Sequence, residues 1–194
     1  MKDRLLNQFL MNGLIEDAGK IAVLSVTEPE KAVETARKLL KNGVNAMEIA
    51  YRNLDNLQGS DECIKAVRKN VPEMLVGAAT VTCPELAKRA KSAGAQFILT
   101  AGFNPKTVKF CVRNKIPVFP GVATPGEIEQ AIGFGLSVLK IFPIEVLGGI
   151  KYLKALSGPY PNIKFIVSGG INAENCAAYA ETKNVAAVSG SYLC

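Results

Sequence analysis

The 194-residue sequence contains no histidine. This absence excludes Ser-His-Asp and Cys-His nucleophilic systems, together with every metal site built on imidazole. No acidic cluster replaces imidazole at a suitable ligand spacing, so we expect neither a metal nor a cofactor. Acid–base chemistry is left to carboxylates, lysine, tyrosine, hydroxyl groups or the substrate itself.

Long apolar runs, paired cysteines and blocks of one charge are also missing. No apolar run is long enough to cross a membrane, so no membrane partner is expected. The net charge of +6 is spread along the chain, which predicts no nucleic-acid partner. The odd number of cysteines and the lack of a CxxC pair predict free thiols in a cytoplasmic protein. These cysteines are Cys63, Cys83, Cys111, Cys176 and Cys194.

What is present first is an amphipathic pattern over residues 1–17. Apolar residues recur there at helical spacing among five charged residues, which predicts a helix and not a signal peptide. The apolar positions are Leu5, Leu6, Phe9, Leu10, Leu14 and Ile15.

Eight short apolar runs follow, alternating with helix-like segments of roughly ten to fifteen residues. The runs are 21–25, 46–50, 74–77, 96–100, 117–120, 138–142, 164–167 and 186–188. This α/β alternation predicts a parallel sheet closed into one (β/α)8 barrel domain over residues 1–194. An open doubly wound sheet is the alternative. Because the sequence stops soon after the eighth run, we expect the eighth helix to be short or missing, or the chain to be clipped.

Three threonine–glutamate pairs with a spacing of three predict capping boxes at helix starts. They are Thr27 with Glu30, Thr82 with Glu85, and Thr124 with Glu127.

One lysine, Lys140, interrupts the apolar run 138–142. A lysine is almost never fully buried unless it has a charged partner or a functional role, and burial disfavours its charged form. A neutral amine attacks carbonyl carbon to form a Schiff base, so we interpret Lys140 as a nucleophile. A lysine that extends to solvent from a strand end is the alternative.

Polar residues also follow the second and third runs. Period-two alternation places Glu48 and Arg52 on one face, so both would enter the barrel mouth if that face is inward. A structural salt bridge is the alternative. Thr80 follows a stretch of small residues and offers a hydroxyl group to a ligand.

Glycine-rich turns follow the seventh and eighth runs. The first contains Ser168, Gly169 and Gly170, and the second contains Gly190 and Ser191. Backbone N–H groups of loops in these two places form the usual phosphate site of such barrels.

The sequence resembles the 2-keto-3-deoxy-6-phosphogluconate (KDPG) and 4-hydroxy-2-oxoglutarate (KHG) aldolase family from about residue 21 to residue 193. The stretches that carry the resemblance are GVNAMEIAYR (43–52), VGAATV (76–81), AGAQF (93–97), IPVFPGVAT (116–124), LKIFP (139–143) and SGGI (168–171). The resemblance implies a homotrimeric class I aldolase. It would cleave a 2-keto-3-deoxy-6-phospho sugar acid to pyruvate and glyceraldehyde 3-phosphate.

The resemblance also implies a role for each matching residue. Lys140 would form the Schiff base and Glu48 would be the acid–base group. Arg52 and Thr80 would hold the pyruvate carboxylate, and Phe142 would pack beside the imine. The phosphate would be held by the loops with Ser168, Gly169, Gly170, Gly190 and Ser191.

Four positions depart from the pattern usual in the family, and they leave the substrate open. Ser168 replaces a threonine. Ser25 replaces a frequent arginine, Ala79 a glycine, and Ala101 a proline. Aldolases for 4-hydroxy-2-oxoglutarate or a 6-phosphogalactonate-type acid are alternatives. A phosphate-binding epimerase or synthase barrel, and a non-catalytic barrel that binds a keto acid, remain as further alternatives.

Overall fold

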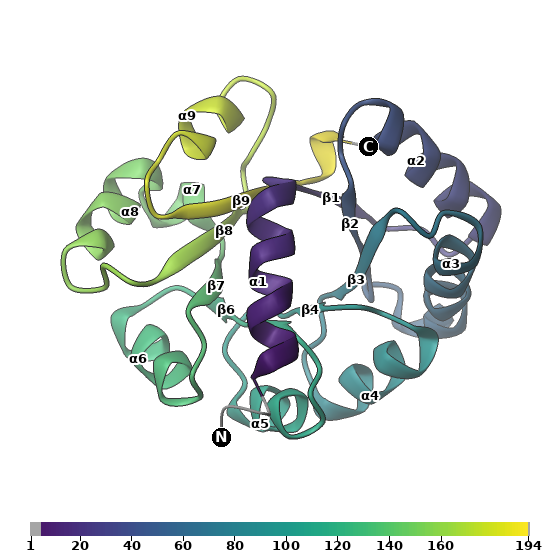
Figure 1. Cartoon of the computed structure of the whole chain (residues 1–194), viewed down its shortest axis with the longest axis horizontal. Helices are drawn as coiled ribbons and strands as arrows, with labels where there is room; N and C mark the ends of the chain where they lie inside the picture. The colour runs from purple at the N-terminus through teal and green to yellow at the C-terminus, as the bar shows by residue number, and fades with distance from the viewer. Residues whose placement is uncertain (1–4, 194) are drawn as a thin grey trace.

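The computed structural model describes residues 5–193, and its strands form a ring that most of the helices surround (Figure 1). The first four residues of the predicted helix and Cys194 lie outside the described residues. The strands are β1 (Lys20–Leu24), β2 (Ala46–Ala50), β3 (Leu75–Ala79), β4 (Ile98–Leu99), β5 (Val118–Phe119), β6 (Gly121–Val122), β7 (Val138–Ile141), β8 (Lys164–Ser168) and β9 (Val185–Gly190). Every strand pair is parallel, and the predicted barrel is confirmed.

The ring closes at Pro120. The predicted fifth run, 117–120, contains β5, which pairs with β4; β6 begins directly after Pro120 and pairs with β7. Proline has no N–H to give to a sheet, but its carbonyl accepts a hydrogen bond from the Lys140 N–H at 2.9 Å. The chain therefore changes partner at Pro120, and β5 and β6, which stand at the two ends of the sheet order, are joined through this residue.

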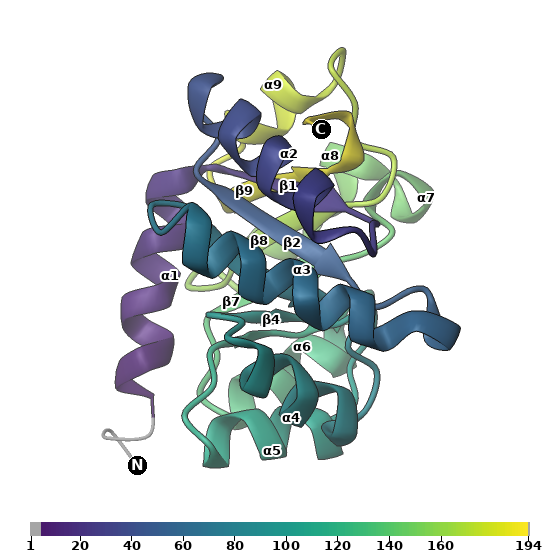
Figure 2. The same cartoon turned by 90° about the vertical axis from the view of Figure 1, so that its right-hand side faces the viewer.

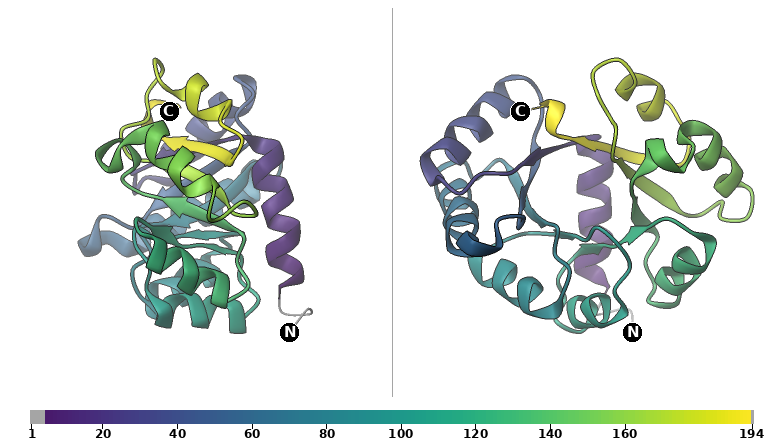
Figure 3. Two further views of the ribbon diagram at one scale, coloured as in Figure 1. Left: turned by 90° about the vertical axis from the view of Figure 1, so that its left-hand side faces the viewer. Right: turned by 180° about the vertical axis from the view of Figure 1, so that it is seen from behind.

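Helices lie around the ring, and the first of them crosses one of its ends (Figure 3). They are α1 (Leu6–Ala18), α2 (Pro29–Lys41), α3 (Leu57–Asn70), α4 (Pro84–Ala93), α5 (Pro105–Arg113), α6 (Pro125–Gly133), α7 (Ile144–Leu147), α8 (Gly149–Ser157) and α9 (Cys176–Ala180), with the 3-10 helices η2 (Leu54–Asn56) and η3 (Ser191–Leu193). After β9, the described residues contain only η3.

Only one of the three predicted capping boxes forms. Thr124 and Glu127 make it at the start of α6. The prediction is wrong for α2 and α4, whose N-caps are Glu28 and Cys83. Proline occupies the first position of all three helices, so the residue directly before it becomes the N-cap. Thr124 is that residue, whereas Thr27 and Thr82 lie one position too early.

The predicted first helix is confirmed as α1, which crosses the amino-terminal end of the barrel, and the β2 arrow points away from it (Figure 2). Its buried face differs from the one that the apolar spacing suggests. Gln8 and Asn12 are buried with Met11 and Ile15, while Leu6, Phe9, Leu10 and Leu14 are exposed. The polar residues face inward because the barrel end offers backbone groups to bind: the Val118 N–H donates to Gln8 Oε1 at 2.7 Å.

The barrel interior is filled by apolar side chains below its open mouth. One buried cluster consists of Met11, Ile15, Ile21, Ala46, Phe97, Leu99, Phe119, Val138, Ile166, Ala186 and Ala187. Gly77 admits the Phe97 ring, since a Cβ at Gly77 would lie 2.3 Å from it. This layer closes the amino-terminal half, so only the carboxyl ends of the strands leave space for a ligand.

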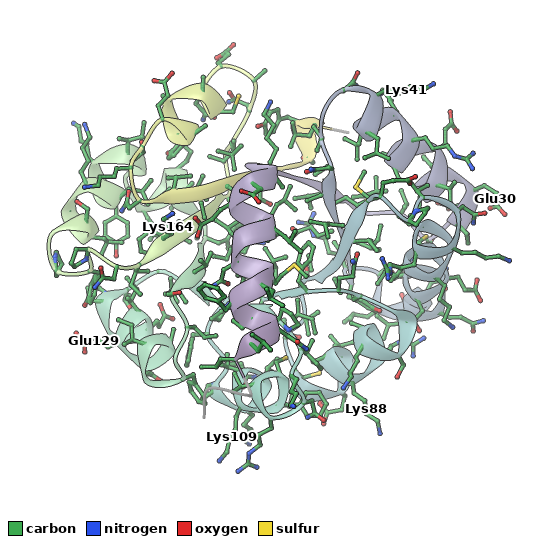
Figure 4. All side chains as sticks on the ribbon, viewed as in Figure 1. Glu30, Lys41, Lys88, Lys109, Glu129 and Lys164 are labelled. Carbon is green, nitrogen blue, oxygen red and sulfur yellow. The ribbon has the colours of Figure 1, made fainter. Side chains whose placement is uncertain are left out.

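The outer face of the helical ring is charged. Figure 4 shows Glu30, Lys41, Lys88, Lys109 and Glu129 pointing outward from it, and all five are exposed. Among residues 5–193, no helix combines the length and apolar character needed to cross a membrane.

Candidate active site

Lys140 projects into the barrel from β7 and is only 6% exposed. Its neighbours Val138, Leu139 and Ile141 are apolar residues that favour a buried strand. Backbone pairing of Lys140 with Gly121 on β6 and with Ile166 on β8 fixes the direction of its side chain. The Nζ atom lies 5.8 Å from the centre of the Phe142 ring.

Glu48 faces Lys140 across the barrel. It lies at the middle of β2, paired with Val23 and Gly77, and is 1% exposed. Its Oε1 is 3.6 Å from the Lys140 Nζ, and its Oε2 is buried with no hydrogen-bond partner among the described residues. The pair therefore brings a buried amine and a carboxylate with one uncommitted oxygen to the same point. Proton transfer needs such a carboxylate next to the reacting atoms.

All ten predicted site residues line two adjoining cavities at the carboxyl ends of the strands. The inner cavity, of about 50 Å³, is lined by Val23, Glu48, Arg52, Thr80, Ala101, Lys140, Phe142 and Ser168. The outer cavity, of about 130 Å³, is lined by Val23, Arg52, Phe142, Ser168, Gly169, Gly170, Ile171, Ser189, Gly190 and Ser191. Arg52, Phe142 and Ser168 border both, so the two cavities form one candidate site.

Thr80 holds an unusual backbone conformation at the inner cavity. Its φ of 59° is in the left-handed region, which a β-branched residue rarely adopts. Hydrogen bonds on either side hold it: the Tyr51 N–H donates to the Ala79 carbonyl, and the Val81 N–H to the Leu99 carbonyl. Such strain is typical of functional sites, and it turns Thr80 out of the line of β3.

The loop after β8 depends on its two glycines. Gly169 and Gly170 have φ values of 92° and 86°. A Cβ on Gly169 would lie 2.8 Å from Pro143 Cα, and one on Gly170 would lie 2.5 Å from Glu145 Cγ. Only glycine fits both the conformation and the space, and the absence of side chains exposes the backbone to the cavity.

Tyr179 and Glu145 brace this loop from outside the cavity. The Tyr179 hydroxyl donates a hydrogen bond to Glu145 Oε1, and the Glu145 N–H donates to the Gly169 carbonyl at 3.2 Å. Burial, and then the hydrogen bond and charge of Glu145, raise the pKa of Tyr179 above its ordinary value. The tyrosine therefore stays protonated as a donor to Glu145.

Sequence reasoning missed Ser189 as a site residue. It is 0% exposed, pairs with Ser168 across β8 and β9, and its Oγ has no hydrogen-bond partner within residues 5–193. A serine at the carboxyl end of a barrel strand was the available signal, but register alone decides whether it points inward.

The four departures from the family pattern lie at different distances from the site. Ser168 lines both cavities. Ala101 lines the inner cavity. Ser25 lines a separate cavity beside the ends of β1 and β2, and Ala79 is buried behind Thr80. Ser168 and Ala101 are therefore the departures that border the candidate site directly.

Comparison with known proteins gives consistent matches. The model of the family described as "KDPG and KHG aldolase" matches residues 12–194. A protein of Treponema pallidum named 2-dehydro-3-deoxy-phosphogluconate aldolase is 40% identical over 179 residues, which are 92% of this chain and 83% of that protein.

Two solved structures share the fold over most of both chains. One is the KDPG aldolase of Legionella pneumophila with pyruvate captured as a covalent carbinolamine intermediate. It is 32% identical with a TM-score of 0.86, and the match covers 93% of this chain and 86% of that chain. The other is the 2-keto-3-deoxy-6-phosphogluconate aldolase of Zymomonas mobilis with 3-phosphoglycerate. It is 28% identical with a TM-score of 0.87, and the match covers 95% of this chain and 86% of that chain. The buried lysine–glutamate pair at the barrel mouth thus belongs to a chain that is a member of the KDPG and KHG aldolase family.

Proposed function

We propose that this chain is a lyase: a class I aldolase that cleaves a 2-keto-3-deoxy-6-phospho sugar acid to pyruvate and glyceraldehyde 3-phosphate. The observation that carries the proposal is the buried contact of 3.6 Å between Lys140 Nζ and Glu48 Oε1 at the barrel mouth. The related enzyme with pyruvate held as a carbinolamine supports the same chemistry here.

Lys140 would begin the reaction by attacking the C2 carbonyl. The carbinolamine loses water to give a protonated imine, which draws electrons from the neighbouring carbons. Glu48, directly or through a water molecule, takes the proton of the C4 hydroxyl. The C3–C4 bond then breaks, its electron pair forms an enamine, and the aldehyde leaves. Reprotonation at C3 and hydrolysis of the imine release pyruvate and restore the lysine.

The remaining inner-cavity residues suit a carboxylate beside the imine. Arg52 supplies a guanidinium that binds carboxylates through two hydrogen bonds, and Thr80 supplies a hydroxyl. Phe142, with its ring near Nζ, would pack beside the imine.

The outer cavity suits the phosphate. Its glycine loops expose backbone N–H groups, and Ser168, Ser189 and Ser191 add hydroxyls. The relative bound to 3-phosphoglycerate supports a phosphorylated ligand in this family. Because the inner cavity holds the proposed reacting groups by itself, 4-hydroxy-2-oxoglutarate, which lacks a phosphate, is a second candidate substrate.

We further propose that residues 1–194 act as one domain in a cytoplasmic homotrimer. The family resemblance supports the trimer. The free thiols of Cys63, Cys83, Cys111 and Cys176 support a reducing compartment.

Borohydride reduction in the presence of pyruvate tests the proposed chemistry. Peptide mapping should find a reduced pyruvyl group on Lys140, and Lys140→Arg should abolish both labelling and cleavage. Lys164→Arg is the control, because Lys164 is exposed and bonded to Glu16 on the outer surface. Labelling of another lysine, or of none, would overturn the mechanism.

A further inference from the structure

Both carbonyl groups of the Gly169-Gly170 pair are held by neighbouring segments. The Glu145 N–H, in α7, donates to the Gly169 carbonyl at 3.2 Å. The side-chain Nδ2 of Asn175, at the start of α9, donates to the Gly170 carbonyl at 2.9 Å. The two peptide units of the loop are therefore fixed from α7 on one side and from Asn175 on the other.

These two bonds decide where the loop N–H groups point. A trans peptide unit is planar, and its N–H points opposite to its C=O. Holding the Gly169 carbonyl fixes the Gly170 N–H, and holding the Gly170 carbonyl fixes the Ile171 N–H. Neither N–H has an acceptor within residues 5–193, and both residues line the outer cavity.

Asn175 is itself oriented by Asn172. The Asn172 N–H donates to Asn175 Oδ1 at 2.9 Å, so the amide oxygen is occupied and the amide nitrogen faces Gly170. Asn172 Oδ1 in turn accepts from the N–H groups of Glu174 and Asn175. The two side chains therefore differ in their hydrogen bonding: the Asn172 side chain acts as an acceptor, whereas the Asn175 side chain must donate to the Gly170 carbonyl.

We propose that Asn175 is a positioning residue for the substrate anion: its amide holds the Gly170 carbonyl and thereby aims the Ile171 N–H into the outer cavity. Asn175 does not line that cavity, so it acts through the loop and without touching the substrate. This inference rests on the proposed function, because it requires an anionic group in the outer cavity.

Asn175→Asp tests the inference, and Asn172→Asp is its matched control. Aspartate at 175 still accepts from the Asn172 N–H, but it cannot donate to the Gly170 carbonyl and repels it. Aspartate at 172 adds the same charge to the same loop and keeps the acceptor that this position uses. Asn175→Ala removes the donor without adding charge. Gly170 is unsuitable as a test position, because any Cβ there meets Glu145.

The measurements are kcat and KM for the phosphorylated acid and for 4-hydroxy-2-oxoglutarate, together with inhibition by inorganic phosphate. In Asn175→Asp and Asn175→Ala, we expect the KM for the phosphorylated acid and the inhibition constant of phosphate to rise about tenfold, the usual effect of losing one charge-assisted hydrogen bond. Kinetics with 4-hydroxy-2-oxoglutarate should change less than about twofold, and Asn172→Asp should change all values less than about threefold.

Three results would overturn the inference. They are an equal loss on both substrates, an equal loss in Asn172→Asp, and a wild-type enzyme that phosphate does not inhibit. Pyruvate trapping on wild-type Lys140 separates these results from failure of the proposed function. If pyruvate is trapped on Lys140, the aldolase chemistry is supported and only the proposed role of Asn175 is contradicted. If no pyruvate is trapped, the proposed function itself is contradicted.

Discussion

Two charged side chains, Lys140 and Glu48, share the interior of this barrel, and each is the counterion of the other. They are 6% and 1% exposed. Removing one partner of such a pair leaves an uncompensated buried charge, which typically costs about 3–5 kcal/mol of stability. Conservative amides and matched surface controls are therefore needed to separate catalysis from folding at these positions.

The first prediction concerns Glu48. Glu48→Gln keeps the size of the side chain but cannot accept the proton of the C4 hydroxyl. We expect kcat to fall by about a hundredfold or more, while pyruvate still forms a borohydride-reducible imine on Lys140. Steady-state kinetics and mass spectrometry measure the two effects. Glu34→Gln, on the exposed face of α2, is the control. A normal kcat in Glu48→Gln would mean that the Lys140–Glu48 pair has a structural role only.

The second prediction concerns Arg52, which is exposed at the mouth and borders both cavities. Arg52→Ala removes the proposed partner of the pyruvate carboxylate. The KM should rise about tenfold or more for every keto acid tested, with or without a phosphate. Arg37→Ala on α2 gives the comparison at an exposed arginine away from the mouth. An effect confined to phosphorylated substrates would assign Arg52 to the phosphate instead.

At the scale of the element, α1 combines two faces that a hydropathy pattern does not distinguish. Ile15 is fully buried against the barrel interior, whereas the adjacent Leu14 is 45% exposed. Gln8 and Asn12 bind Val118 and Ser137 at the barrel end. The helix therefore closes the barrel through a mixed polar and apolar face.

The third prediction compares these neighbours. Ile15→Ala should lower the free energy of unfolding by about 2–5 kcal/mol, because it leaves a cavity in the closed end of the barrel. Leu14→Ala should lower it by less than about 0.5 kcal/mol, as at an exposed site. Urea denaturation of both variants measures the difference. Equal losses would mean that the outward face of α1 is covered in solution.

At the scale of the whole molecule, polar networks join elements outside the barrel. The Tyr51 hydroxyl donates to Asp61 on α3 at 2.6 Å, and Asp61 is 2.7 Å from Arg89 on α4. Burial, followed by the hydrogen bond and charge of Asp61, raises the pKa of Tyr51. Tyr51 follows the end of β2, so this network ties the strand that carries Glu48 to two outer helices.

The fourth prediction follows from the raised pKa of Tyr51. A phenol protonated more tightly in the folded state stabilises the fold fully below its ordinary pKa of about 10. As the pH rises above that value, the unfolded chain releases the proton first, so stability falls by up to about 1.4 kcal/mol per pH unit. Urea midpoints should therefore decrease above about pH 10. The decrease should be shallower in Tyr51→Phe, and equal slopes would contradict the assignment.

The order of the elements could be predicted from the sequence, and so could the burial that underlies the chemistry proposed for Lys140. Apolar runs at strand length and helix-like spacing depend on local residue patterns. A lone lysine in such a run is informative by itself, because an unpartnered buried amine is costly. The resemblance to the family implied roles for Glu48, Arg52 and the glycine loops, and it too rests on short stretches of sequence.

Only the tertiary structure decided which distant groups meet. The 3.6 Å contact joins β2 to β7 across the barrel, and register alone turns Ser189 inward. Thr80 adopts its left-handed conformation because bonds to neighbouring strands hold it, and Asn175 reaches Gly170 through the turn that Asn172 forms. The sequence by itself determined the order of the strands and helices and singled out Lys140 as the proposed nucleophile, since both depend on neighbours along the chain. Closure at Pro120, the buried face of α1 and the direction of the loop N–H groups depend on contacts between distant segments, which only the folded barrel brings together.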